Sequence, residues 1–156
     1  MTKNQNIIVA LNKILTVELT SINQYFLHAR IFKHWGLEGL NSKEYKKSIL
    51  DMKQADRLIE RILFLGGLPN LQLLNKVNIG EDTEEIIQAD LELENSELTL
   101  LKQVIKECED AEDFVSRDII EKILEEEEEY YDWLIVQQEL IGNINIKNYQ
   151  QSMMEK

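Results

Sequence analysis

The stretch IQADLELENSELTLL, residues 87–101, decides the fold class of this chain. Read at steps of four, three, four and three, one face of it consists of Ile87, Leu91, Glu94, Leu98 and Leu101. That spacing is typical of one side of an α-helix, so a carboxylate stands in the middle of an apolar helical face. Because a buried, ionised carboxylate is costly unless it is paired or binds a cation, Glu94 indicates a charged site inside a helical bundle.

Three other helical stretches are interrupted in the same way, by Glu18, Asp51 and Glu127. Four-helix bundles that hold two metal ions use one Glu from each of two helices and a Glu-x-x-His unit from each of the other two. Here the units are Asp51-x-x-Gln54 and Glu127-x-x-Tyr130, so both histidines are missing. Converging carboxylates repel one another without a cation, and their hard oxygen atoms favour iron, manganese or magnesium. The pattern predicts a metal site with an altered ligand set.

Each acid taken alone also fits an exposed helix face. Glu127 belongs to the acidic run 125–129, and Glu94 has acidic neighbours at Glu92 and Glu97. A set of four, one per helix at matching heights, is what favours the metal site over this alternative.

Imidazole ligands would add a preference for transition metals at this site. His28 and His34 both lie in the first helical stretch, and neither has the spacing that would complete the site. Lys47 lies one helical turn before Asp51 on the same face. We hypothesise that Lys47 partly replaces the missing metal charge. The alternative is an exposed or channel-facing lysine.

Apolar periodicity predicts four long helices and a short fifth, over about residues 4–35, 41–65, 83–105, 112–141 and 147–154. Asn41 and Glu44 are expected to form a capping box at the start of the second helix. Gly39, together with Gly36, is expected to end the first helix, and Gly142 the fourth.

The segment 68–82 contains the only proline and has no clear period. A loop of this length is unusual inside a compact domain, and in a helical protein it suggests a crossover between two parallel helices. Four long helices with a crossover between the second and third form the ferritin-like arrangement. We therefore expect an all-α chain with one ferritin-like four-helix bundle domain over residues 1–156 and a short C-terminal fifth helix.

Composition limits the kinds of binding partner and the cellular compartment that we expect. The formal net charge of −12 argues against nucleic acid and against an anionic membrane. No apolar run approaches the length of about 20 residues that spans a bilayer, and no signal peptide is apparent. Cys108 is the only cysteine, which suggests a reducing compartment. We expect a cytoplasmic protein.

Several strings carry a resemblance that covers nearly the whole chain. They are Glu18 with INQYFLHAR at 22–30, Asp56-Arg57 with IERILFL at 59–65, GLPNL at 67–71, NIGED at 78–82 and VSRD at 115–118. Together they closely resemble the bacterioferritins. The resemblance implies a hollow shell of twenty-four subunits that stores ferric mineral. It also implies b-type haem at two-fold interfaces, held by one methionine from each of two subunits.

On this resemblance Met52 is the axial haem ligand, and its alternative is a core or interface methionine. Methionine ligation raises the haem potential and suits electron transfer. In the family, a bacterioferritin-associated ferredoxin docks on the shell and supplies the electron that reduces stored iron for release. Leu68, Glu81 and Glu85 occupy the expected docking positions.

The resemblance also assigns the metal site, with ligand positions at Glu18, Asp51, Glu94 and Glu127 and with Tyr25 near the di-iron centre. Asp51 replaces a bridging glutamate and is shorter by roughly 1.5 Å. Gln54 and Tyr130 stand where the family has histidine ligands. Lys46 and Leu50 replace inner-surface residues that some members use for iron transfer.

These departures leave three functions open. We favour a haem-bearing structural subunit of an iron-storage shell with weak or lost ferroxidase activity, which could co-assemble with a second bacterioferritin subunit type. The second is an active ferroxidase that oxidises Fe(II) with O2 or H2O2 at a remodelled di-iron site. The third has Tyr130 bound to ferric iron as a phenolate.

Overall fold

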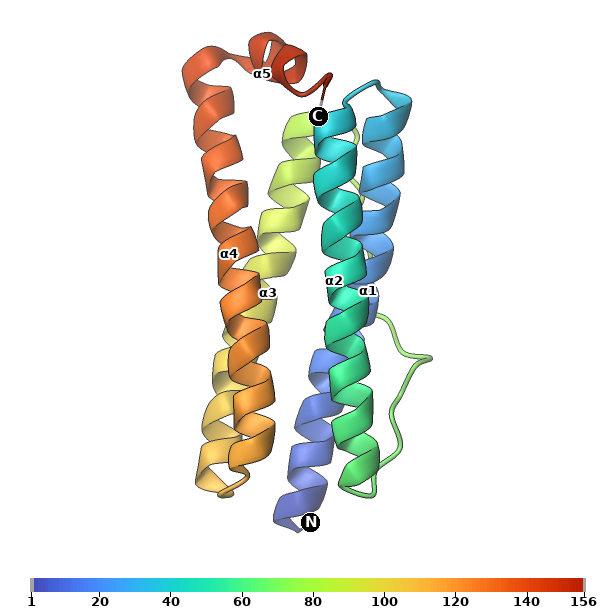
Figure 1. Cartoon of the computed structure of the whole chain (residues 1–156), viewed down its shortest axis with the longest axis vertical. Coiled ribbons are helices and arrows are strands. Elements are labelled where there is room, and N and C mark those ends of the chain that lie inside the picture. The colour runs from blue at the N-terminus through green and yellow to red at the C-terminus, as the bar shows by residue number, and fades with distance from the viewer. Residues whose placement is uncertain (1, 156) are drawn as a thin grey trace.

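The computed structural model describes residues 2–155. This part of the chain contains five helices and no strand. They are α1 (Lys3–His34), α2 (Glu38–Phe64), α3 (Thr83–Asp110), α4 (Phe114–Ile144) and α5 (Ile146–Ser152). α1 and α4 run in one direction along the bundle, α2 and α3 run in the other, and α5 lies across one end (Figure 1). Residues 65–82 run along the bundle to join the parallel α2 and α3. The predicted ferritin-like bundle with a crossover and a short fifth helix is confirmed.

The turn between α1 and α2 is tighter than predicted. Gly36, with φ of +80°, reverses the chain, and α2 begins three residues before Asn41. The capping box predicted at Asn41 and Glu44 is therefore wrong, since both residues are buried inside α2. Gly39 does not end α1 either. It lies in α2 and donates its N–H to the carbonyl of Met153 at 2.9 Å. A Cβ at this position would lie 3.0 Å from the carbonyl oxygen of Glu155, closer than ordinary van der Waals contact.

The end of α4 also differs from the prediction. The helix continues through Gly142 to Ile144, and the break comes at Asn145, whose φ is +63°. The Asn145 side chain accepts a hydrogen bond from the backbone N–H of Asn148 at 3.2 Å and so caps α5. A positive φ is uncommon for a residue with a side chain, and this hydrogen bond helps to hold Asn145 in it.

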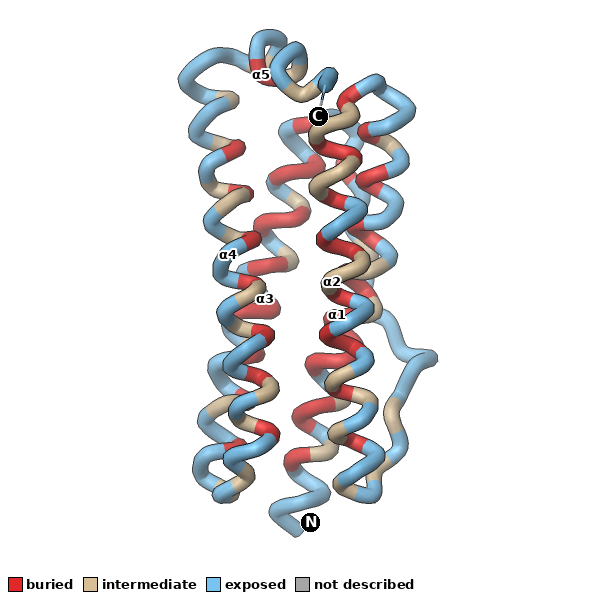
Figure 2. Tube along the Cα trace, in the orientation of Figure 1, coloured by how far each residue is buried: buried red, intermediate tan, exposed pale blue. Residues whose placement is uncertain are grey.

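A band of polar side chains divides the apolar core into two clusters. On α1 the first cluster ends at Leu15 and the second begins at Tyr25, and most of the buried residues between them are polar. Buried residues line the inner faces of all four long helices (Figure 2). Burial of each leucine or isoleucine side chain stabilises the fold by about 1.5–3 kcal/mol. The two apolar clusters therefore hold the polar band in place. None of the helices within residues 2–155 has both the length and the apolar character that a membrane span requires.

The crossover is attached to α1 by a row of polar side chains spaced four residues apart. Thr20 Oγ1 accepts from Asn75 N at 2.9 Å, Gln24 Oε1 from Asn78 N at 3.2 Å, and His28 Nε2 from Gly80 N at 3.1 Å. These bonds satisfy backbone donors that have no partner in a ladder or helix. His28 therefore has a structural role outside the carboxylate group.

Candidate metal centre

The four predicted carboxylates converge at the middle of the bundle, one from each long helix. Glu18 comes from α1, Asp51 from α2, Glu94 from α3 and Glu127 from α4, and each is 0% exposed. They lie in the polar band between the two apolar clusters. The alternative of an exposed helix face is therefore wrong for Glu94 and Glu127.

Lys47 of α2 reaches into this group of carboxylates. Its Nζ donates to Asp51 Oδ1 and, at 2.9 Å, to Glu127 Oε1. The same atom lies 3.7 Å from Glu94 Oε1. Because Lys47 is only 4% exposed, the alternative of an exposed lysine is wrong. A positive charge therefore lies among three of the oxygen-bearing side chains that the sequence assigned to metal.

The carboxylates keep Lys47 charged. Burial alone would lower the pKa of Lys47, but Asp51, Glu127 and Glu94 raise it well above its ordinary value. Burial acts to raise the pKa of Glu127, yet Lys47 and the Gln54 amide bring it below its usual range. Burial raises the pKa of Asp51 to about 7, although Lys47 acts in the opposite direction. One ammonium therefore neutralises only part of the buried charge.

Two tyrosines face the Lys47 ammonium, with ring centroids 5.1 Å (Tyr25) and 4.9 Å (Tyr130) from Nζ. Tyr25 donates its hydroxyl to Glu94 Oε1 at 2.7 Å, so it lies beside the buried carboxylates. Tyr130 instead donates to Glu44 Oε1 at 3.0 Å. Burial and Glu44 raise the pKa of Tyr130 well above its ordinary value, which disfavours a phenolate.

Gln54 stands where the family has a histidine ligand, and its side chain acts as a hydrogen-bond donor instead. Its Nε2 donates to Glu127 Oε2 at 3.0 Å and to Glu126 Oε1 at 3.2 Å. Its Oε1 is buried and has no hydrogen-bond partner. Asp51 Oδ2 accepts from Ser21 Oγ at 2.7 Å, so the shorter carboxylate is held on both sides.

The sequence interpretation missed Glu97, a fifth buried carboxylate. It is 0% exposed, and one of its oxygens lies within 4.8 Å of an oxygen of Glu18 and of Glu127. Glu97 follows Glu94 by three residues on α3, so the two share a helical face. The signal was present in a second row at helical spacing: Asp90, Glu94, Glu97, Leu101, Val104 and Cys108 are all buried.

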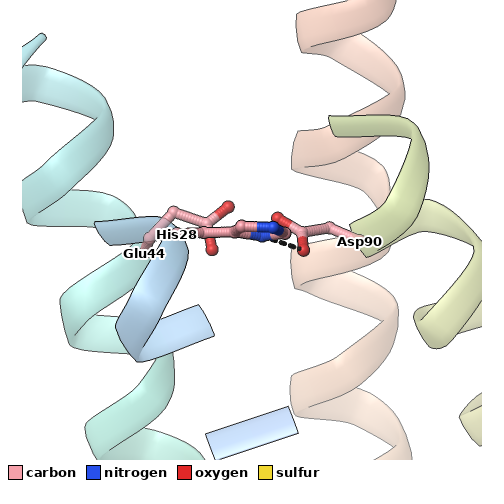
Figure 3. A group of neighbouring side chains, drawn as sticks. All are labelled: His28, Glu44 and Asp90. Carbon is pink, nitrogen blue, oxygen red and sulfur yellow. Dashed lines mark hydrogen bonds and ion pairs between the residues drawn. The ribbon is translucent and has the colours of Figure 1, made fainter. Parts of the chain in front are cut away.

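A second buried polar cluster comprises His28 of α1, Glu44 of α2 and Asp90 of α3 (Figure 3). His28 Nε2 accepts a hydrogen bond from Gly80 N, so Nδ1 carries the proton and donates to Asp90 Oδ1 at 2.9 Å. Burial beside Asp90 raises the pKa of Glu44 well above its usual range. With both ring nitrogens engaged, His28 offers no free lone pair to a metal ion. Glu44 Oε1 accepts from Tyr130, whereas Glu44 Oε2 and Asp90 Oδ2 have no hydrogen-bond partner.

A surface cavity of about 220 Å³ reaches Lys47 and Tyr130 from outside. Its other lining residues are Lys43, Lys46, Leu50, Glu126 and Glu129. The resemblance placed Lys46 and Leu50 where some relatives have iron-transfer residues, and here they lie at the mouth of the approach to Lys47. Glu126 and Glu129 offset much of the positive charge that Lys43, Lys46 and Lys47 bring to this opening.

The candidate haem ligand Met52 lies on the outer side of α2 and is 49% exposed. It shares a helical face with Tyr45, whose ring packs 6.3 Å from that of Phe26 on α1. Phe26 and Tyr45 are also exposed. The thioether is therefore accessible beside exposed aromatic side chains, which rules out a core methionine and leaves both a haem ligand and an interface methionine as alternatives.

The remaining predicted site residues lie at the surface. Leu68, Glu81 and Glu85 are exposed, and so is His34. Glu85 Oε1 accepts from Glu81 N at 3.1 Å at the start of α3. Leu68 begins the crossover near the end of α2, whereas Glu81 and Glu85 lie at the other end of the bundle (Figure 1).

Comparisons with known proteins agree with this arrangement. The ferritin-like domain family matches residues 8–144, which include the buried carboxylates of all four long helices. A bacterioferritin of Brucella melitensis is 37% identical over 145 residues, which cover 93% of this chain and 90% of that protein. A bacterioferritin of Mycobacterium leprae is 36% identical over 149 residues, or 96% and 94% of the two chains. A bacterial ferritin of Synechocystis sp. is 38% identical over 149 residues, or 95% and 96%. The chain belongs to the bacterioferritins, within the ferritin-like family.

Proposed function

We propose that this chain is an iron-storage subunit whose own ferroxidase activity is weak or absent. The position of Lys47 carries the proposal, since its ammonium pairs with Asp51, Glu94 and Glu127. An iron ion bound to the same oxygens would lie within about 4 Å of that ammonium. At 4 Å, two unit charges repel by about 4 kcal/mol at an effective dielectric constant of 20, and a divalent ion doubles this. The residues present therefore do not fit two adjacent iron ions.

The residues at the two replaced histidine positions also argue against a di-iron site. Gln54 directs its amide nitrogen at Glu127, and Tyr130 directs its hydroxyl at Glu44. Neither presents a nitrogen lone pair of the kind that imidazole offers to iron. The Tyr130 contact also argues against the phenolate alternative.

In this proposal iron is the cargo of an assembled shell. Exposed apolar side chains support assembly, because patches of this kind mark protein interfaces. Phe64, Leu68, Leu71 and Leu73 are each more than half exposed in the single chain. A second bacterioferritin subunit type that retains both histidines would supply Fe(II) oxidation to a mixed shell.

We also propose that Met52 holds b-type haem, with the exposed apolar surface around Phe26 and Tyr45 against its macrocycle. Haem bound through methionine would supply electron transfer. A bacterioferritin-associated ferredoxin is the proposed electron donor. Because Leu68 lies far from Glu81 and Glu85 in one chain, its docking surface would combine residues of two subunits.

Replacing Met52 with leucine is expected to abolish haem binding and to leave shell assembly intact, because leucine keeps the volume and lacks the thioether. The measurement is the haem-to-protein ratio after reconstitution, read from the Soret absorbance, with Met154→Leu as the matched control. Met154 is also exposed. Equal haem content in Met52→Leu and wild type would refute the assignment.

Aerobic Fe(II) addition to the purified homopolymer tests the ferroxidase part of the proposal. Slow oxidation that does not saturate and is the same in Glu18→Gln is expected. Fast, saturable oxidation that Glu18→Gln removes would show an active ferroxidase and overturn the proposal. Glu125→Gln, at an exposed position of the acidic run, is the control for a general loss of surface charge.

A further inference from the structure

Two fully buried carboxylates, Glu18 and Glu97, have no hydrogen-bond donor on any of their four oxygen atoms. Within residues 2–155 the ion pairs of Lys47 go to Asp51, Glu94 and Glu127 and to neither of these two. Lys47 therefore forms ion pairs on one side of the polar band, and Glu18 and Glu97 on the other side have no direct cationic partner. Buried carboxylates of this kind are stable when they coordinate a cation or take up a proton.

The geometry on that side suits one ion. Glu18 of α1, Glu97 of α3 and Glu127 of α4 each offer an oxygen, and these three atoms lie within 4.8 Å of one another. An ion with metal–oxygen distances of about 2–2.5 Å fits between atoms at this separation after small side-chain rotations. The unpartnered Oε1 of Gln54 adds a neutral oxygen on a side chain already bound to Glu127.

We propose that Glu18, Glu97 and Glu127 form a site for a single divalent cation, with Lys47 occupying the position of a second one. The ligand set consists of hard oxygens, so it takes Mn²⁺, Mg²⁺ or Fe²⁺ rather than a thiolate- or imidazole-seeking metal. With five buried carboxylates and one ammonium, a divalent ion would halve the excess negative charge. The inference rests on the proposed function in one respect, namely that Lys47 keeps its present position.

The competing explanation is a shared proton. Burial and the surrounding carboxylates raise the pKa values of both Glu18 and Glu97 well above the usual range. In the metal-free protein the pair can therefore hold a proton between them. A cation and a proton would compete for the same oxygens, so the two explanations differ in whether a metal displaces the proton.

The test is titration of the metal-stripped, full-length homopolymer with Mn²⁺, followed by equilibrium dialysis and electron paramagnetic resonance. Prolonged incubation is needed because the ligands are buried. We expect one tightly bound Mn²⁺ per chain with the spectrum of an isolated ion. Glu97→Gln should weaken this binding at least tenfold, on the order of what loss of an outer-shell partner costs in metal sites. Glu92→Gln, at an exposed position on the same helix, should leave it unchanged.

Each other outcome is decisive. No tight Mn²⁺ in wild type would favour the shared proton and overturn the inference, while leaving the proposed loss of ferroxidase activity intact. One tight ion with equal affinity in wild type and Glu97→Gln would remove Glu97 from the site. Two ions per chain with an exchange-coupled spectrum would overturn both the inference and the proposed function. Glu18→Gln gives a second test if Glu97→Gln does not fold.

Discussion

Replacing Lys47 with methionine is expected to lower the free energy of unfolding of the metal-free protein by about 3–5 kcal/mol, the typical cost of removing one partner from a buried ion pair. Methionine preserves most of the side-chain volume, so the loss reports charge rather than a cavity. Asp51 and Glu127 would each lose a hydrogen bond to an ammonium while staying buried. Urea unfolding of shells stripped of metal, followed by circular dichroism, measures the change.

Two further variants separate charge from packing. Lys46→Met alters the neighbouring, exposed lysine of the same helix and should change stability by less than about 0.5 kcal/mol. Lys47→Met combined with Asp51→Asn removes one of the stranded carboxylates and should recover part of the loss. If the double variant is no more stable than Lys47→Met, repulsion among the carboxylates is not the cause. If Lys47→Met matches wild type, Lys47 does not compensate the carboxylates.

The buried helix faces and the crossover could be predicted from the sequence, because they depend on apolar periodicity and on charged residues within apolar helical faces. The helical rows through Glu18 and Glu94 fixed which side of each helix is buried, and the long segment without a period predicted the crossover between parallel helices. Helix ends were less predictable because they depend on contacts distant in sequence. Gly39 lies inside a helix and donates its N–H to the carbonyl of Met153, a contact that no local sequence signal reports.

The charge distribution inside the bundle was only partly predictable. Asp51 and Lys47 share a helix and a face, so their contact followed from spacing. The contact between Lys47 and Glu127 crosses the bundle and follows only from the packing of α2 against α4. Glu97 was overlooked because its sequence neighbour Glu94 already accounted for one acid on that helix. Testing both rows of a helix face for buried acids would have found it.

Restoring the family's ligand set is expected to raise ferroxidase activity well above that of the natural chain. The variant combines Lys47→Met with Asp51→Glu, Gln54→His and Tyr130→His. It supplies two imidazoles and a longer bridging carboxylate, and it removes the ammonium from among Asp51, Glu94 and Glu127. Since changes in the outer shell alone alter metal affinity or activity by about 10–100-fold, we expect the initial rate of aerobic Fe(II) oxidation to rise by at least about 100-fold. Stopped-flow absorbance on the homopolymer measures it.

The matched control keeps Lys47 and changes only the three ligand positions. If the ammonium is the main obstacle, this triple variant remains close to wild type, because a second cation still meets the charge of Lys47 at about 4 Å. A triple variant as fast as the quadruple one would mean that the missing histidines, and not Lys47, limit Fe(II) oxidation in the natural chain. A quadruple variant that assembles and binds two Mn²⁺ per chain but oxidises Fe(II) no faster than wild type would place the obstacle elsewhere. The lysine-lined approach formed by Lys43 and Lys46 would be the next position to change.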